Sequence, residues 1–127
     1  MYYFSKKTAL MNYSNNTYKT HDGNELVTYK WDCEKPKAII HIVHGMSEHA
    51  DRYDDFASEL NNQGFIVYSS DLRGHGKTAG SLENIGQFAM EDGWNKVVKD
   101  IIGLSYRFKK ENPKLPLFIL GHSMGSF

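Results

Sequence analysis

Three short apolar runs along the chain predict strands. They are residues 38–43 (AIIHIV), 65–68 (FIVY) and 117–120 (LFIL). Each run is nearly free of polar residues, which is typical of strands that are covered on both faces, as in parallel sheets. We therefore expect these runs to form the central strands of one sheet.

Between these runs, apolar residues recur at the three- and four-residue spacing of helices. The first predicted helix lies around residues 53–60, and Gly64 follows it as a stop. The second extends from about residue 91 to residue 111, and its apolar stripe should pack on the core: Trp94, Val97, Val98, Ile101, Ile102, Ser105 and Phe108. Strands that alternate with helices predict right-handed crossovers and a parallel sheet with helices on both faces.

The chain before residue 38 has a different pattern. Residues 1–16 are polar and rich in Asn, with no clear period, and we expect a polar N-terminal extension there. Residues 17–19 begin a strand, residues 21–24 (HDGN) form a turn, and residues 26–31 (LVTYKW) return as the second strand of a hairpin. The expected fold class is α/β, with residues 17–127 in a single domain.

Composition narrows the function classes. The 127 residues include 15 Lys plus Arg and 15 Asp plus Glu, so the formal net charge is zero. A nucleic-acid binder should carry a basic excess, and this balance argues against that class. The single cysteine, Cys33, excludes a disulfide framework. Because neither a signal peptide nor an 18-residue apolar window is recognisable, we expect a cytoplasmic protein without a transmembrane segment.

The motif with the clearest chemistry is Gly121-x-Ser123-x-Gly125, directly after an apolar strand. This context is typical of a nucleophile elbow, a sharp strand-to-helix turn that exposes a serine hydroxyl. Bulk two residues before or after the serine would clash, and the Met124 N–H would point toward a developing oxyanion. The alternative is a tight turn that contains a serine without catalytic use.

A second motif, His44-Gly45-Met46, follows the first buried strand. A hydrolase with a nucleophile elbow needs another backbone N–H donor from the loop at this position. The Met46 amide could supply it if Gly45 lets the loop approach the elbow. An ordinary glycine turn at a strand end is the alternative interpretation.

Three segments together resemble a known family. They are HGMSEHADRYDDFASEL (44–60), DLRGHGKT (71–78) and GHSMGS (121–126). In this order they resemble the monoacylglycerol lipase and lysophospholipase branch of the α/β-hydrolases. The resemblance implies a carboxylic-ester hydrolase that needs no cofactor or metal and acts on a small lipid ester, a monoacylglycerol or a lysophospholipid. Thr78 and Ser126 are mild departures from the family pattern.

The resemblance also implies roles for individual residues. Ser123 corresponds to the nucleophile, and the amides of Met46 and Met124 to the oxyanion hole. Support for the elbow and its neighbouring loop is implied for Gly121, His122, Gly125, His44 and Gly45. Further supporting positions in the matching motifs are Glu48, His49, Arg52, Tyr53, Asp71, Arg73, Gly74, His75 and Gly76.

The Asp and His partners of such a serine come later along the chain in this fold. We therefore expect this sequence to be the N-terminal portion of the hydrolase domain, truncated just after the elbow and inactive alone. The apolar strand before the elbow should expose a face that favours aggregation. Three alternatives are a base supplied by His44 or His75, a non-catalytic truncated product, and a related hydrolase that acts on another bond, such as a peptidase.

Two other interpretations are weak. Gly76-Lys77-Thr78 resembles the end of a P-loop, but Asp71 stands where the leading glycine is required. His41, His44 and His49 could suggest a metal site. They lack the spacing of a zinc-binding helix, so structural roles are favoured.

Overall fold

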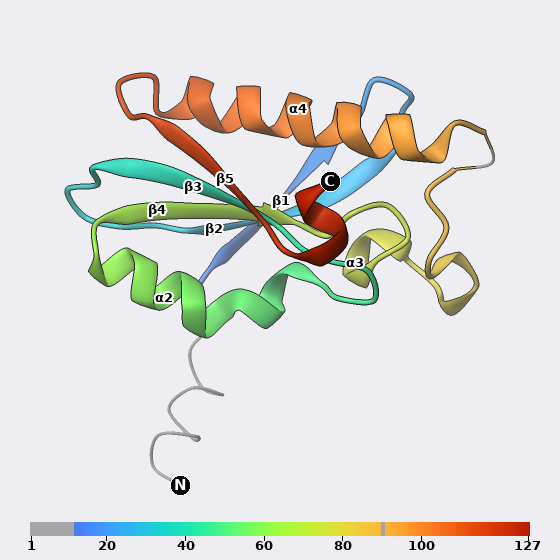
Figure 1. Cartoon of the computed structure of the whole chain (residues 1–127), viewed down its shortest axis with the longest axis horizontal. Helices are drawn as coiled ribbons and strands as arrows, with labels where there is room; N and C mark the ends of the chain where they lie inside the picture. Colours follow the sequence, from blue (N-terminus) through green and yellow to red (C-terminus); the bar gives the residue numbers. More distant parts are fainter. Residues whose placement is uncertain (1–11, 90) are drawn as a thin grey trace, which may run out of the picture.

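The computed structural model describes residues 12–89 and 91–127. They form one five-stranded sheet with the strand order β1-β2-β4-β3-β5 (Figure 1). The strands are β1 (Ser14–Lys19), β2 (Glu25–Trp31), β3 (Ala38–Val43), β4 (Phe65–Ser70) and β5 (Leu117–Gly121). All three apolar runs are strands, and the expected α/β class is confirmed.

The sheet is mixed. β3 lies between β4 and β5 and runs parallel to both. β2 joins the other side of β4 in antiparallel orientation, and β1 pairs antiparallel with β2 as a hairpin. The parallel arrangement expected for the sheet therefore holds among β3, β4 and β5, whereas the hairpin extends the sheet with antiparallel strands.

The hairpin begins earlier than the sequence pattern predicted. β1 starts at Ser14, three residues before the expected start, and Ser14 pairs with Lys30 of β2. Residues 14–16 therefore belong to the sheet and not to an extension, and residues 1–11 of that predicted extension lie outside the described residues. Polar side chains are compatible with an exposed edge strand because the backbone makes the pairing, so hydrophobic periodicity gave no signal here.

Two long helices cover opposite faces of the sheet, as expected (Figure 1). α2 (Asp54–Asn62) follows a 3-10 turn, η1 (Ala50–Tyr53), and α4 (Gly93–Glu111) precedes β5. The glycine-rich loop after β4 contains two short elements that the sequence did not predict, α3 (Gly76–Ala79) and η2 (Leu82–Asn84). A final 3-10 turn, η3 (Ser123–Ser126), follows β5.

The core has two layers, one on each side of the sheet. Beneath α2 lie Tyr29, Trp31, Ile40, Ile42 and Val67, with Ala57 from the helix. Beneath α4 lie Leu26, Ile39, Ile66 and Tyr68, with Leu104 and Phe108 from the helix. Every residue of β3 is buried, which explains why its sequence is almost entirely apolar.

The one polar side chain of β3, His41, lies beneath α4. Its Nδ1 is 2.8 Å from the hydroxyl of Ser105, and its ring meets that of Phe108 edge to face. Burial lowers the pKa of His41 to about 4, because the charged imidazolium would lose its hydration. His41 is therefore a neutral, structural histidine near pH 7.

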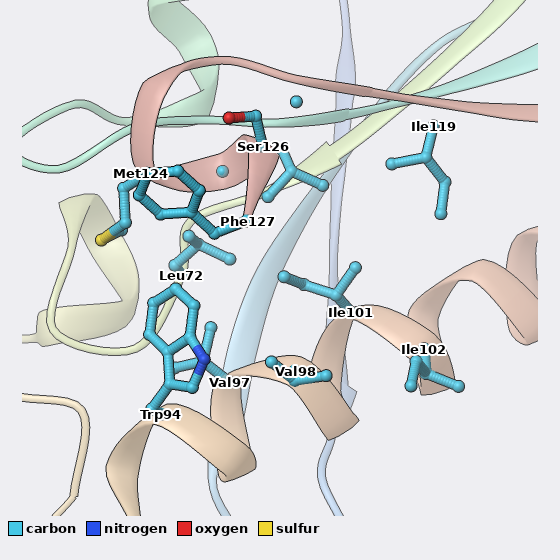
Figure 2. Close-up of a pocket in the computed structure, with 13 residues that line it drawn as sticks. Leu72, Trp94, Val97, Val98, Ile101, Ile102, Ile119, Met124, Ser126 and Phe127 are labelled. Atoms are coloured by element: carbon cyan, nitrogen blue, oxygen red, sulfur yellow. The ribbon is translucent and has the colours of Figure 1, made fainter.

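α4 presents two adjacent apolar stripes. The stripe on the sheet contains Phe108, which was predicted, together with Leu104 and Asp100, which the predicted stripe omitted. Trp94 and Ile102, predicted to pack on the core, are 43% and 51% exposed. They line an apolar groove of about 330 Å³ between α4 and the β5–η3 segment (Figure 2).

Candidate active site

The turn after β5 has the backbone geometry of a strand-to-helix elbow. Ser123 adopts a left-handed conformation with φ +54°, which is rare for a residue other than glycine. The turn is closely packed on both sides of the serine. A Cβ on Gly121 would collide with the carbonyl of Gly125, and one on Gly125 would collide with the carbonyl of Val43. Both glycines are therefore sterically required, and Ser123 is held at the exposed tip.

The loop after β3 lies directly against this elbow. A Cβ on Gly45 would be 3.2 Å from the Cβ of Ser123 and 3.1 Å from the carbonyl oxygen of His122. The backbone N–H of His122 also donates to the carbonyl of Val43, at 3.1 Å. Two segments that are far apart in the sequence, residues 43–48 and 121–126, thus form one compact unit.

Both candidate oxyanion donors have unused backbone N–H groups. Within residues 12–89 and 91–127, no acceptor is hydrogen-bonded to the N–H of Met46 or of Met124. The Ser123 hydroxyl likewise has no hydrogen-bond partner in this part of the chain. A polar reactant could therefore approach the serine and be met by free backbone donors.

The carboxylate of Glu48 connects the loop to the elbow. Oε2 accepts the backbone N–H of Gly45 at 2.8 Å and lies 2.8 Å from Nδ1 of His122. Oε1 accepts the hydroxyl of Tyr53 at 3.1 Å and forms a weaker ion pair with Arg52 at 3.5 Å. Burial alone would raise the pKa of Glu48, but the donors from His122, Gly45 and Tyr53 outweigh it and lower the pKa.

His44 and His75 lie beside this unit, with ring centroids 5.1 Å apart. Both nitrogens of His44 are engaged, because Nδ1 is 2.7 Å from the Gly45 carbonyl and Nε2 accepts the Leu72 N–H at 3.0 Å. Burial lowers the pKa of His44. Nδ1 of His75 is 2.8 Å from the carbonyl of Arg73. Neither ring is hydrogen-bonded to Ser123, so the geometry gives no support to a base from these histidines.

Asp71, at the end of β4, holds three elements together from a fully buried position. One oxygen accepts the Tyr29 hydroxyl at 2.7 Å and the Lys77 N–H at 2.9 Å, and the other accepts the Ala50 N–H at 2.7 Å. The backbone of Gly76 is packed against the same carboxylate. Asp71 therefore positions the loops after β3 and β4 through its hydrogen bonds to the Ala50 and Lys77 amides.

Arg73 is buried between two carboxylates. Its guanidinium donates to Asp22 at 2.5 and 2.7 Å and to Asp100 at 2.5 and 2.9 Å. Hydrogen bonds from Arg73 and from Thr20 lower the pKa of Asp22, whereas burial raises the pKa of Asp100. This Asp22–Arg73–Asp100 cluster joins the hairpin turn to the loop after β4 and to α4. The sequence analysis missed both carboxylates, although the turn at Asp22-Gly23 was recognised.

The remaining predicted positions are peripheral. His49 pairs with Asp51 at the surface, and Gly74 is packed against the backbone of Gln87. The histidines considered as metal ligands do not gather. Among the described residues, the side chains close enough to share a cation are His21, Asp22 and Asp100, whose ligand atoms lie within 4.8 Å of one another. There the Arg73 guanidinium already pairs with both carboxylates.

A parallel β3–β4–β5 core flanked by helices, with a glycine-framed serine turn after β5, defines the N-terminal part of an α/β-hydrolase fold. The family comparison agrees. The model of the family described as serine aminopeptidase, S33, matches residues 34–127, and the chain belongs to that family.

Individual relatives are named as lipases and esterases. The chain is 38% identical over 91 residues to the monoglyceride lipase homolog of Monkeypox virus, covering 72% of this chain and 31% of that protein. It is 34% identical over 105 residues to monoglyceride lipase of Rattus norvegicus, covering 82% and 33% respectively. The crystal structure of a carboxyl esterase from Bacillus coagulans superposes with a TM-score of 0.81 at 32% identity, over 92% of this chain and 38% of that one.

The chain thus spans about a third of the length of these curated relatives. None of the helices in the described part of the chain is long and apolar enough to cross a membrane.

Proposed function

We propose that this chain supplies the nucleophile and the oxyanion hole of a carboxylic-ester hydrolase. The observation that supports the proposal is the contact between the Ser123 elbow and the Gly45 loop, which joins the segment of a strained, exposed serine to the segment that contains the unused Met46 donor. The Ser123 hydroxyl attacks the ester carbonyl, and the Met46 and Met124 amides stabilise the oxyanion. The alcohol leaves, and water then hydrolyses the acyl-enzyme.

The substrate class follows from the relatives. Two of them are named for monoglycerides, so the proposed substrate is a small lipid ester, either a monoacylglycerol or a lysophospholipid. The family description, serine aminopeptidase, keeps peptide bonds as the alternative substrate. The same elbow chemistry serves both bonds, so the pocket around the acyl group and the leaving group decides between them.

A serine needs a base to act as a nucleophile at neutral pH. Since no described histidine is hydrogen-bonded to Ser123, we infer that the proton acceptor comes from polypeptide other than residues 12–89 and 91–127. Residues 1–127 alone should then show no serine-dependent turnover of a short-chain nitrophenyl ester. A rate that Ser123→Ala abolishes would contradict this inference.

The function itself is tested on the complete reading frame. The source DNA is sequenced beyond codon 127, and the whole encoded protein is assayed on a monoacylglycerol, a lysophospholipid and an aminoacyl nitroanilide. We expect ester hydrolysis that Ser123→Ala abolishes and Ser126→Ala leaves largely intact, since Ser126 is the neighbouring exposed serine. Unchanged hydrolysis by Ser123→Ala, or cleavage of the anilide alone, would overturn the proposal.

A further inference from the structure

We propose that Glu48 is a positioning residue that fixes the loop carrying the Met46 amide against the elbow carrying the Met124 amide. This inference rests on the proposed function, because it assigns both amides to one oxyanion hole. It adds that the alignment of the two donors is built into this part of the chain by a single buried carboxylate.

The two oxygens of Glu48 have separate tasks. Oε2 contacts the Gly45 N–H and His122 Nδ1, both at 2.8 Å, and so spans two segments 74 residues apart in the chain. Oε1 contacts Tyr53 and Arg52, which belong to the adjacent η1 turn. The Oε2 contacts join the two segments of the candidate oxyanion hole, whereas the Oε1 contacts connect Glu48 to η1.

The local backbone is arranged so that Glu48 can make the first of these contacts. Ser47 adopts a left-handed conformation with φ +60°, which turns the chain back and brings the Glu48 side chain over Gly45. Met46 is one of the residues between Gly45 and Glu48 that this hydrogen bond encloses in the chain. Because a left-handed serine costs conformational free energy, the Glu48–Gly45 hydrogen bond helps to maintain the turn.

The second contact makes the positions of the two segments interdependent. The Glu48 side chain is only 8% exposed, whereas that of His122 is 61% exposed. The carboxylate is thus the buried, fixed partner, and His122 reaches it from the solvent side. If Oε2 is removed, the elbow keeps its backbone bond to Val43 but loses its side-chain connection to the Gly45 loop.

A purely structural role would make a different prediction. If Glu48 mattered only for η1 and the start of α2, its loss would loosen residues 50–62 and leave the elbow unchanged. Hydrogen–deuterium exchange, resolved by segment, separates these roles without any activity measurement. If exchange shows that Glu48 does not position the elbow, the proposal of ester hydrolysis is unaffected. If the complete protein does not hydrolyse esters, the exchange result is equally unaffected.

The experiment compares amide exchange in the wild-type chain with that in Glu48→Ala, Glu48→Gln and Tyr53→Phe. In Glu48→Ala we expect exchange about tenfold faster or more in both segments 44–48 and 121–127, since hydrogen bonds to a charged group are among the stronger ones. Glu48→Gln keeps one oxygen acceptor and should restore part of the protection at 44–48. Tyr53→Phe should leave both segments unchanged, because it removes a contact of Oε1 only.

Two further variants keep the test decisive. Glu59→Ala removes an exposed carboxylate on α2 and is the matched control. His122→Ala alters an exposed side chain and should fold even if Glu48→Ala does not; it should speed exchange at 121–127 while 44–48 stays protected by Glu48. If exchange at 121–127 is as slow in His122→Ala and Glu48→Gln as in the control Glu59→Ala, Glu48 does not position the elbow and the proposal is wrong.

Discussion

Two neighbouring regions of the molecule, the loops after β3 and β4 and the face formed by β5 and α4, differ in what they bury and what they expose. The loops after β3 and β4 bury charged groups, including Glu48, Asp71 and Arg73, and give each of them hydrogen-bond partners from several elements. The β5–α4 face is apolar and open: Ile119 of β5 and Ile102 of α4 are 55% and 51% exposed. Polar side chains are enclosed in the first region, while apolar ones meet solvent in the second.

The two regions are therefore stabilised in different ways. The loop region is held by hydrogen bonds and ion pairs such as those of Glu48, Asp71 and Arg73, so its geometry depends on specific donors and acceptors. The apolar face gains little from being exposed and would be stabilised by any apolar partner that covers it. The candidate nucleophile lies where the two regions meet, because η3 contributes to both the Gly45 contact and the groove.

The largest effect is expected when the positive charge is removed from the Asp22–Arg73–Asp100 cluster. Arg73→Met leaves Asp22 and Asp100 without their shared partner, and breaking such a buried pair costs about 3–5 kcal/mol. We expect a loss of this size in the free energy of unfolding, measured by urea denaturation. Since small domains have about 5–15 kcal/mol in total, this variant should be close to unfolded.

Lys110→Met is the matched control, because Lys110 is an exposed cation on α4. Its effect should stay within about 0.5 kcal/mol. Arg73→Lys retains the charge but cannot donate two hydrogen bonds to each carboxylate. Its loss in the free energy of unfolding should therefore lie between those of Arg73→Met and Lys110→Met. Equal stability of Arg73→Met and Lys110→Met would mean that the loop region does not depend on its buried charges.

Lowering the pH should destabilise the packing between the sheet and α4, because His41 is buried there in its neutral form. Because its pKa is lowered from 6.5 to about 4 in the folded chain, the neutral form is favoured by folding. The stability linked to His41 is thus fully present above pH 6.5 and is lost as the pH falls toward 4. At about 1.4 kcal/mol per pKa unit, the loss is about 3 kcal/mol.

The measurement is the free energy of unfolding at pH 7 and pH 4.5 for the wild type and for His41→Asn, which does not titrate. The wild-type chain should lose more stability than the variant over this interval. His49→Asn serves as the control, because the surface pair of His49 with Asp51 should contribute less than about 1 kcal/mol. Parallel pH profiles for wild type and His41→Asn would show that His41 is not the group responsible.

The sequence predicted the apolar elements well because their signal is local. Ala38–Val43 and Leu117–Gly121 are strands, and α4 was located to within two residues at its start. Two errors show where this local signal ends. Ser14–Asn16 were missed since an edge strand needs no apolar side chains, and Trp94 was assigned to the core because periodicity cannot tell which of two adjacent stripes meets the sheet.

The candidate site was predictable in its motifs but not in its connections. Gly45, Ser123 and the two glycines of the elbow follow from the motif sterics, and the structure places Gly45 against Ser123. The partner of Glu48 is 74 residues away in sequence, and those of Arg73 are 51 and 27 residues away. No local pattern encodes such pairings, since they arise only when the loops at the sheet edge are brought together.

The smallest expected effect on stability concerns the open apolar face, where the readout is association. Residues 1–127 expressed alone should self-associate with rising concentration, because β5 is an edge strand with exposed apolar side chains. Ile119→Lys, on the exposed side of β5 that lines the groove, should increase the monomer fraction in light scattering coupled to gel filtration. It should change the free energy of unfolding by about 0.5 kcal/mol or less.

Tyr106→Lys is the matched control for this substitution. Tyr106 is 74% exposed on α4 and does not line the groove, so the same added charge there should leave association unchanged. If Ile119→Lys and Tyr106→Lys raise the monomer fraction equally, net charge and not the apolar face governs association. If the wild type is monomeric throughout, exposed apolar area on β5 is tolerated in solution, and the contrast between the two regions reduces to the buried charges alone.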